Sequence, residues 1–174
     1  MPQVSVRDSR RSPEDRRWIE EHYREYLNDL APSATGLFPA LGEIGHRVPD
    51  QLMRWYADSS AHALAILYGE ERVGFAMVDR RLRPGTGGPG EPEYSMAEFF
   101  VARAWRRRGI GGEAVRLILD RFAGHWLITE HSRNAAAVTF WRRVVSAYTD
   151  GRYQERVFNG EVHQRFESAP KRPR

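Results

Sequence analysis

The chain has 174 residues, of which 41% are hydrophobic, and this length and composition suit one folded domain rather than a disordered chain. It contains no cysteine, which excludes disulfides, thiolate zinc sites and cysteine nucleophiles and fits a cytoplasmic protein. The formal net charge is +4, and Lys171 is the only lysine. Most arginines alternate with acids, as on a solvated helix face, and no apolar run approaches the roughly 18 residues of a membrane span. We therefore expect neither a nucleic-acid partner nor a membrane segment.

The first half of the sequence predicts a strand, two helices and a β-hairpin. A short strand at 4–6 precedes Ser12, which suits the N-cap position because a proline follows it. Apolar residues then recur at helical spacing and predict a helix over 13–29. The stretch 49–58 predicts a second, short helix. Two apolar runs flank the turn at 69–71 and predict a hairpin.

The second half alternates strands with helices and ends in another hairpin. The stretch 94–102 is too apolar for an edge strand, and a glycine-rich turn and a helix follow it. A strand at 125–130 and an Asn-led helix at 134–145 come next. The Asn159-Gly160 pair predicts a type I′ hairpin. A strand, a helix and a strand in this order imply a parallel crossover.

This order of elements, β-α-α-β-β-β-α-β-α-β-β, predicts the α/β (α+β) class. We expect a mixed, mostly antiparallel central sheet flanked by about four helices. The glycine- and proline-rich stretch 81–93 is expected to form a surface loop. Residues 1–167 should form a single domain, and 168–174 should be a disordered tail.

The residues most suggestive of chemistry stand in "RRRGIGGEA", Arg106 to Ala114. A strand that leads into a glycine-rich turn and a helix can bind an anion, because the first helical N–H groups lack partners and the helix dipole is positive there. Arginines add charge-assisted bonds that suit phosphate. One interpretation is a dinucleotide fingerprint, formed by Gly109, Gly111 and Ala114. Glu130, about 20 residues farther on, would then bind the ribose of a nicotinamide-dependent oxidoreductase.

The position of the preceding strand argues against a dinucleotide. Val101 ends that strand eight residues before Gly109, whereas a dinucleotide-binding strand runs almost directly into the first glycine. The stretch Val101–Gly112, "VARAWRRRGIGG", resembles the acetyl-CoA signature R/Q-x-x-G-x-G/A of the GCN5-related N-acetyltransferase (GNAT) family. The stretch Asn134–Arg143, "NAAAVTFWRR", resembles a second element of that family, an Asn-led helix with paired aromatics.

The resemblance implies a fold in which two parallel strands, at about 94–101 and 126–131, splay apart to admit coenzyme A. The first strand would hold the pantetheine arm, amides of the turn the pyrophosphate, and nearby arginines the 3′-phosphate. Asn134 has a second interpretation, as the N-cap of its helix. The positions expected to contact the coenzyme are Phe99, Phe100, Val101, Arg103, Arg106, Arg107, Arg108, Gly109, Ile110, Gly111, Gly112, Asn134 and Phe140.

The reaction implied by the resemblance is direct attack of a neutral amine on the thioester of acetyl-CoA. A free alkylamine is mostly protonated at pH 7, so a base must take its proton. Glu98 matches the strand position where several family members carry a catalytic glutamate. Glu130 and His131, which end the neighbouring strand, are rival bases, and water is a further one.

The general acid is the point at which this sequence departs from the family. Many members place a tyrosine as the second aromatic of the Asn-led helix, where it protonates the leaving thiolate. Trp141 stands there in this chain, and an indole cannot donate a usable proton. Tyr148 is the candidate substitute, with water or Tyr94 as the alternative.

The acceptor pocket is expected from the first two helices and their loop, residues 24–56. Aromatic residues there favour a small-molecule amine over a charged protein tail. The candidate substrate contacts are Tyr26, Phe38, Trp55, Glu130 and His131. We expect acetyl-CoA as co-substrate, no metal, and a monomer or homodimer. The alternatives are the nicotinamide-dependent oxidoreductase and a module that binds coenzyme A without catalysis.

Overall fold

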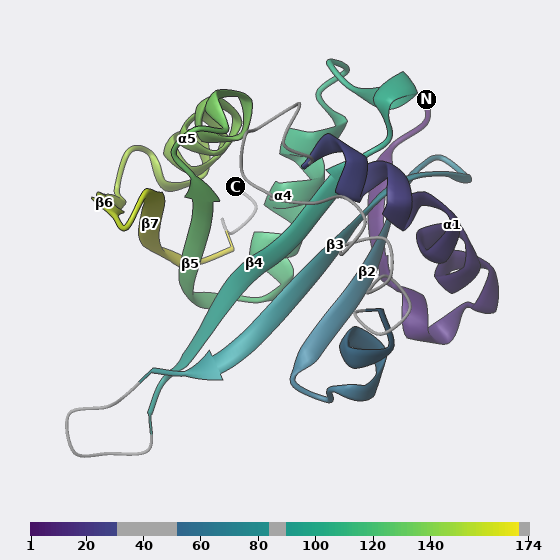
Figure 1. Ribbon diagram of the computed structural model, residues 1–174, viewed down its shortest axis with the longest axis horizontal. Helices are drawn as coiled ribbons and strands as arrows, with labels where there is room; N and C mark the ends of the chain where they lie inside the picture. The colour runs from purple at the N-terminus through teal and green to yellow at the C-terminus, as the bar shows by residue number, and fades with distance from the viewer. Residues whose placement is uncertain (31–51, 84–89, 171–174) are drawn as a thin grey trace.

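The computed structural model describes residues 1–30, 52–83 and 90–170 (Figure 1). Its centre is a seven-stranded sheet in the order β1-β2-β3-β4-β5-β7-β6. The strands are β1 (Val4–Asp8), β2 (Ala61–Tyr68), β3 (Glu71–Leu82), β4 (Pro92–Val101), β5 (Gly124–His131), β6 (Gln154–Phe158) and β7 (Glu161–Ser168). The longer helices are α1 (Pro13–Asp29), α4 (Ile110–Arg121) and α5 (Ala135–Thr149), and residues 52–57 are also helical. Within the described residues, the predicted order of strands and helices is confirmed.

The sheet is antiparallel except for β4 and β5, which run parallel. Only Glu93, Tyr94 and Ser95 of β4 pair with β5, and their partners are residues 125–127. Beyond these pairs the two strands diverge toward their carboxyl ends (Figure 1). The predicted mixed sheet with a splayed parallel pair is therefore confirmed.

The helices form a layer on each face of the sheet. Alternate residues of β3 show the division, because Phe75 and Met77 pack with α1 while Ala76 and Val78 pack with α4 and α5. The α1 side is an aromatic-rich core that includes Ile19, Tyr23, Tyr26, Phe75 and Phe100. The other side is filled by Val115, Ile118 and Leu119 of α4, Trp141 and Val145 of α5, and Trp126 and Ile128 of β5.

Local sequence signals account for the ends of several elements. Helix α1 spans the predicted residues, and the Ser12 side chain accepts a hydrogen bond of 3.2 Å from the Asp15 amide, as an N-cap does. Asn159 and Gly160 both have positive φ, at 50° and 77°, which confirms the I′ type of turn. The expected loop 81–93 is shorter than predicted, because β3 continues through Leu82 and β4 begins at Pro92.

Two short 3-10 turns, Ser9–Arg11 and Arg103–Trp105, were not predicted. The second turn follows β4 directly and fills part of the step between Val101 and the glycines. In the described part of the chain, no helix has the length and apolar character needed to span a membrane.

Candidate active site

A β-bulge in β4 marks the point where β4 and β5 separate. Met77 of β3 pairs with Glu98 and Val78 pairs with Met96, so Ala97 is an extra residue without a partner in β3. Such a bulge bends its strand and increases the local twist. The bulged residue stands two positions after Ser95, the last residue of β4 that pairs with β5. The carboxyl-terminal part of β4 therefore pairs with β3 alone within the described sheet.

The strand segment expected to hold pantetheine alternates between the two cores. Phe99 stacks on Phe140 of α5 with a centroid distance of 5.7 Å, whereas Phe100 packs in the α1 core. Val101 is buried against the first turns of α4. Because these residues pair only with β3 in the described sheet, the edge of β4 that faces β5 has no strand partner here, although the Arg106 side chain occupies the Val101 carbonyl. Such an unpaired edge can accept an extended ligand.

The glycine turn forms the N-terminus of α4. Gly109 occupies the N-cap with a φ of 80°, in the left-handed region that glycine tolerates best, and no side chain caps the helix. The next residues, Ile110, Gly111 and Gly112, begin the helix, so their N–H groups lack intrahelical partners. A Cβ on Gly111 would lie 3.3 Å from the Phe140 ring, and the missing side chain allows α4 to pack closely on α5.

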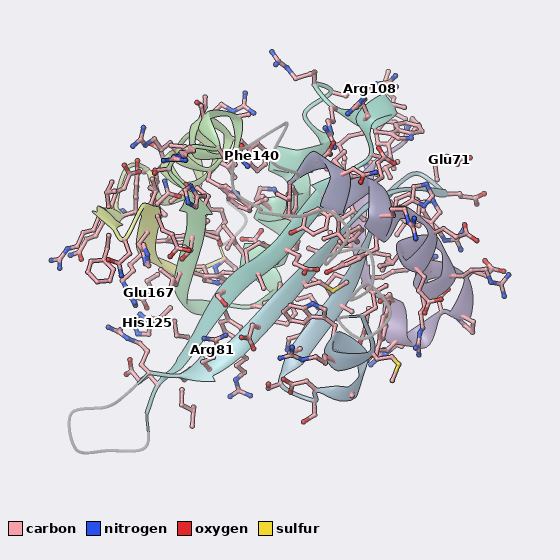
Figure 2. The ribbon with its side chains drawn as sticks, viewed as in Figure 1. Glu71, Arg81, Arg108, His125, Phe140 and Glu167 are labelled. Atoms are coloured by element: carbon pink, nitrogen blue, oxygen red, sulfur yellow. The ribbon has the colours of Figure 1, made fainter. Side chains whose placement is uncertain are left out.

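The arginines beside this turn differ in their surroundings. Arg103, Arg107 and Arg108 are exposed, and Arg108 lies over the ring of Trp105 at 5.1 Å. Figure 2 shows Arg108 at one end of the molecule and His125, from the start of β5, toward the other. Arg106 instead points inward and donates a hydrogen bond of 2.7 Å from Nε to the carbonyl of Val101. The exposed three are the arginines available to a phosphate.

Glu98 lies on the α1 face, just after the bulge. It is 7% exposed, and its Oε1 accepts a hydrogen bond of 2.5 Å from the hydroxyl of Tyr23 on α1. Burial and then the nearby Glu98 charge raise the pKa of Tyr23 above its ordinary value, so this hydroxyl keeps its proton and remains a donor. The sequence does not single out Tyr23 as a partner of Glu98. Its contact with Glu98 joins residues 75 positions apart and has no local signal in the sequence.

Glu130 lies on the opposite face of the sheet from Glu98. Along β5 it shares a face with Ile128 and Trp126, which pack in the core on the α4 and α5 side. Burial, together with the charge of Glu155, raises the pKa of Glu130 to about 8, although Arg142 opposes the shift. Neither carboxyl oxygen of Glu130 meets a hydrogen-bond donor among the described residues. The structure therefore separates this rival base from Glu98 by the thickness of the sheet.

His131 and Tyr148 also lie apart from Glu98. His131 accepts a hydrogen bond of 3.3 Å from the Arg133 amide and lies beside the turn between β6 and β7. Tyr148 donates a hydrogen bond of 2.8 Å to Asp120, ten residues along α4 from Ile110. At 1.5 Å per residue, Asp120 is about 15 Å along the helix from the glycine turn. We do not assign the role of general acid to Tyr148.

The remaining candidates have structural contacts of their own. The Asn134 side chain accepts a hydrogen bond of 3.2 Å from the Ala137 amide and caps α5, which confirms its N-cap interpretation. Tyr26 and Trp55 pack in or against the α1 core. Phe38 lies outside the described residues. Trp141 packs edge-on against Phe99 and Phe140, which explains an aromatic residue at this position without a role in proton transfer.

Comparison with known proteins identifies the family to which this fold and turn belong. Residues 19–145 match the Acetyltransferase (GNAT) family. This match covers most of the chain, and the chain therefore belongs to the GNAT family. A comparison with curated protein sequences finds no match.

Solved structures share the fold at low sequence identity. PaiA N-acetyltransferase from Thermoplasma acidophilum, in complex with coenzyme A, is similar with a TM-score of 0.63 and 11% identity, over 95% of this chain and 99% of that chain. An acetyltransferase from Thermus thermophilus is similar with a TM-score of 0.62 and 15% identity, over 95% and 97%. Arabidopsis thaliana NAA60 in complex with acetyl-CoA has a TM-score of 0.60 and 14% identity, over 95% and 99%.

Proposed function

We propose that the protein transfers the acetyl group of acetyl-CoA to a primary amine of a small molecule, with Glu98 as the general base. The observation that carries this proposal is the position of Glu98, buried on the α1 face at the bulge where β4 leaves β5. A carboxylate there lies close to the point where the two strands separate, and it accepts a hydrogen bond from Tyr23. Membership of the GNAT family and the bound coenzymes of its structural relatives support acetyl-CoA as the donor.

The residues around the opening fit coenzyme A in three respects. The uncapped N-terminus of α4, with glycines at 109, 111 and 112, offers backbone N–H groups and a positive dipole to a pyrophosphate. The open edge of β4 offers backbone groups to the amides of a pantetheine arm. The exposed side chains of Arg103, Arg107 and Arg108 can reach a further phosphate.

The chemistry then requires one proton acceptor near the opening. The neutral amine attacks the thioester carbonyl carbon, so that a carbon–nitrogen bond forms while the carbon–sulfur bond breaks. The Glu98 carboxylate takes the proton that the amine loses, and the thiolate takes a proton from water. Because Tyr23 hydrogen-bonds the carboxylate, Glu98 has a fixed orientation before the amine arrives.

A small-molecule acceptor is the expectation drawn from the aromatic side chains of the α1 layer. Tyr26 is 9% exposed, and Trp55 packs against the same core. Apolar and aromatic walls with few polar groups are typical of sites for small organic ligands. Membership of the GNAT family favours coenzyme A over a nicotinamide dinucleotide at the glycine turn.

The test supplies acetyl-CoA with a panel of primary amines and follows both the release of free thiol and the mass of the acetylated amine. Release should require protein, acetyl-CoA and an amine together. Glu98→Gln should lower turnover by about a hundredfold or more, which is the usual contribution of a general base, and should leave acetyl-CoA binding intact. Glu130→Gln is the matched comparison, because it neutralises the rival carboxylate on the other face.

Three results would contradict the proposal. If acetyl-CoA does not bind, it is not the acetyl donor of this protein. Binding without transfer to any amine would indicate a module that binds coenzyme A without catalysis. Loss of turnover in Glu130→Gln, with full turnover in Glu98→Gln, would move the base to the α5 face.

A further inference from the structure

The last turn of α1 contacts the segment that leads into the glycine turn. Asp29, the final residue of α1, accepts a hydrogen bond from Nη2 of Arg106, and the two side chains form an ion pair. The same guanidinium donates from Nε to the carbonyl of Val101 at 2.7 Å and lies 5.6 Å from the Phe100 ring centroid. Arg106 therefore connects the end of α1, the end of β4 and the glycine turn.

This geometry differs from the role expected from the sequence. Arg106 is the arginine of the R-x-x-G-x-G motif, which the sequence assigns to the coenzyme. Its side chain is 36% exposed and that of Asp29 is 23% exposed, so the pair is partly withdrawn from solvent. Hydrogen bonds to a carbonyl and to a carboxylate fix the orientation of the Arg106 guanidinium. We expect them to restrain the backbone of the turn as well.

The negative charge of Asp29 lies close to a proposed anion site, so its effect on phosphate binding distinguishes two roles for this residue. A carboxylate near an anion site repels the anion, so electrostatics alone predict that removing this charge strengthens the binding of a phosphate ligand. Asp29 also lies 3.4 Å from the guanidinium of Arg103, one of the exposed arginines beside the turn. If Asp29 were only a surface acid, it would weaken the site. If it holds Arg106 in place, its removal would weaken the site instead.

We propose that Asp29 and Arg106 form a latch that fixes the glycine turn against α1 and thereby raises the affinity for coenzyme A. The inference rests on the proposed function, since it assumes that the turn binds the coenzyme. It adds Asp29, a residue outside the family's motifs, as a positioning residue. Because α1 also carries Tyr23, which contacts Glu98, the latch connects the coenzyme turn to the helix that orients the base.

The experiment measures the dissociation constant of coenzyme A by titration calorimetry at one fixed ionic strength, well below the melting temperature of each variant. Asp29→Asn removes the charge and keeps the shape, and should weaken coenzyme A binding by about fivefold or more, the usual size of coupling between sites. The matched control is Glu25→Gln, on the same helix, whose carboxylate accepts a hydrogen bond of 3.4 Å from the Arg103 amide. It removes an acid beside the same segment without touching the latch, and coenzyme A should bind it as tightly as the wild type or more tightly.

A double-mutant cycle provides the second readout. Asp29→Asn and Arg106→Gln each break the same contact, so the double variant should bind coenzyme A about as weakly as Arg106→Gln alone. A loss of stability without a loss of affinity would show that the pair only supports the fold, and would overturn the latch. Equal or tighter binding by Asp29→Asn, or losses that add in the double variant, would overturn it as well. Failure of the wild type to bind coenzyme A would instead contradict the proposed function, so the two failures are distinguishable.

Discussion

Tyr23 on α1 donates a hydrogen bond of 2.5 Å to Glu98 on β4, and both side chains are buried between the helix and the sheet. The proposed base is carried by β4, but the residue that hydrogen-bonds it is carried by α1. Tyr26 and Phe75 pack around Tyr23 with centroid distances of 5.6 and 5.8 Å, so the hydroxyl has little freedom to leave. The orientation of Glu98 therefore depends on how α1 packs.

Tyr23→Phe should lower turnover by roughly tenfold or more, the scale of one hydrogen bond to a charged group. The carboxylate form of Glu98 loses a donor, and a lost donor disfavours the charged form. The acid limb of the pH–rate profile should therefore move to higher pH. Tyr56→Phe is the control, because it removes a tyrosine hydroxyl that contacts Ser9 instead. An unchanged profile in Tyr23→Phe would show that Tyr23 does not act through Glu98.

Gly111→Ala and Gly112→Ala should have opposite effects on stability, although both place alanine in the first turn of α4. A Cβ at 111 would lie 3.3 Å from the Phe140 ring, which Phe99 holds in place by stacking, whereas a Cβ at 112 would lie 3.9 Å from Val144. Urea unfolding should show a loss of about 1 kcal/mol for the first, from overpacking. The second should gain roughly 0.5–1 kcal/mol from helix propensity. Equal stability of the two variants would contradict the close packing of α4 on α5.

Glu130→Gln should be more stable than the wild type at high pH, and the difference between them should grow as the pH rises. The pKa of Glu130 in the folded protein is about 8, above its ordinary value of 4.5. The folded state therefore binds more protons than the unfolded state between these values. The stabilisation that comes from this protonation of Glu130 is complete below pH 4.5 and is lost as the pH rises through 8.

Glutamine cannot ionise, so the variant avoids this loss. Its melting temperature should match that of the wild type near pH 5 and exceed it near pH 8.5, with a difference in unfolding free energy of roughly 1–3 kcal/mol. Glu167→Gln, on β7 and exposed, should show no such dependence on pH. A constant difference between Glu130→Gln and the wild type across the range would contradict a protonated, buried Glu130.

Tyr148→Phe should leave turnover at neutral pH unchanged and should cost about 1 kcal/mol of stability, the usual size of one hydrogen bond. The hydroxyl is a donor to Asp120 at 2.8 Å, and burial, with the hydrogen bond to Asp120, raises the pKa of Tyr148 above its ordinary value. The measurement compares steady-state turnover with urea unfolding of the same preparation. A large fall in turnover at unchanged stability would restore Tyr148 as the acid.

The order of elements was predictable because it depends on local signals. Ser12 and the proline after it determine the start of α1, and the Asn159-Gly160 pair determines the last turn, whatever the rest of the chain does. The glycine turn was also recognisable, because left-handed φ and close packing both require glycine at particular spacings.

The candidate site was only partly predictable, because side-chain direction depends on long-range contacts. Glu98 and Glu130 are both carboxylates on adjacent strands, but only the packing of α1 and α5 shows that they lie on opposite faces. The partner of Arg106 is 77 positions away in the sequence, and no local pattern indicates it. The motif predicts an arginine at position 106, but its contacts with Asp29 and the Val101 carbonyl determine the direction of the side chain.

The bulge at Ala97 changes which alternate residues of β4 face each layer of helices. Met96 before it faces the α4 and α5 core, while Glu98 after it faces α1, although residues two apart in a regular strand share a face. Deletion of Ala97 would make the pairing with β3 regular and would leave Met96 and Glu98 on their present sides. Such a chain should still fold, but with a straighter β4 that runs alongside β5. A single residue of chain length therefore sets the course of β4 relative to β5 beyond Ser95.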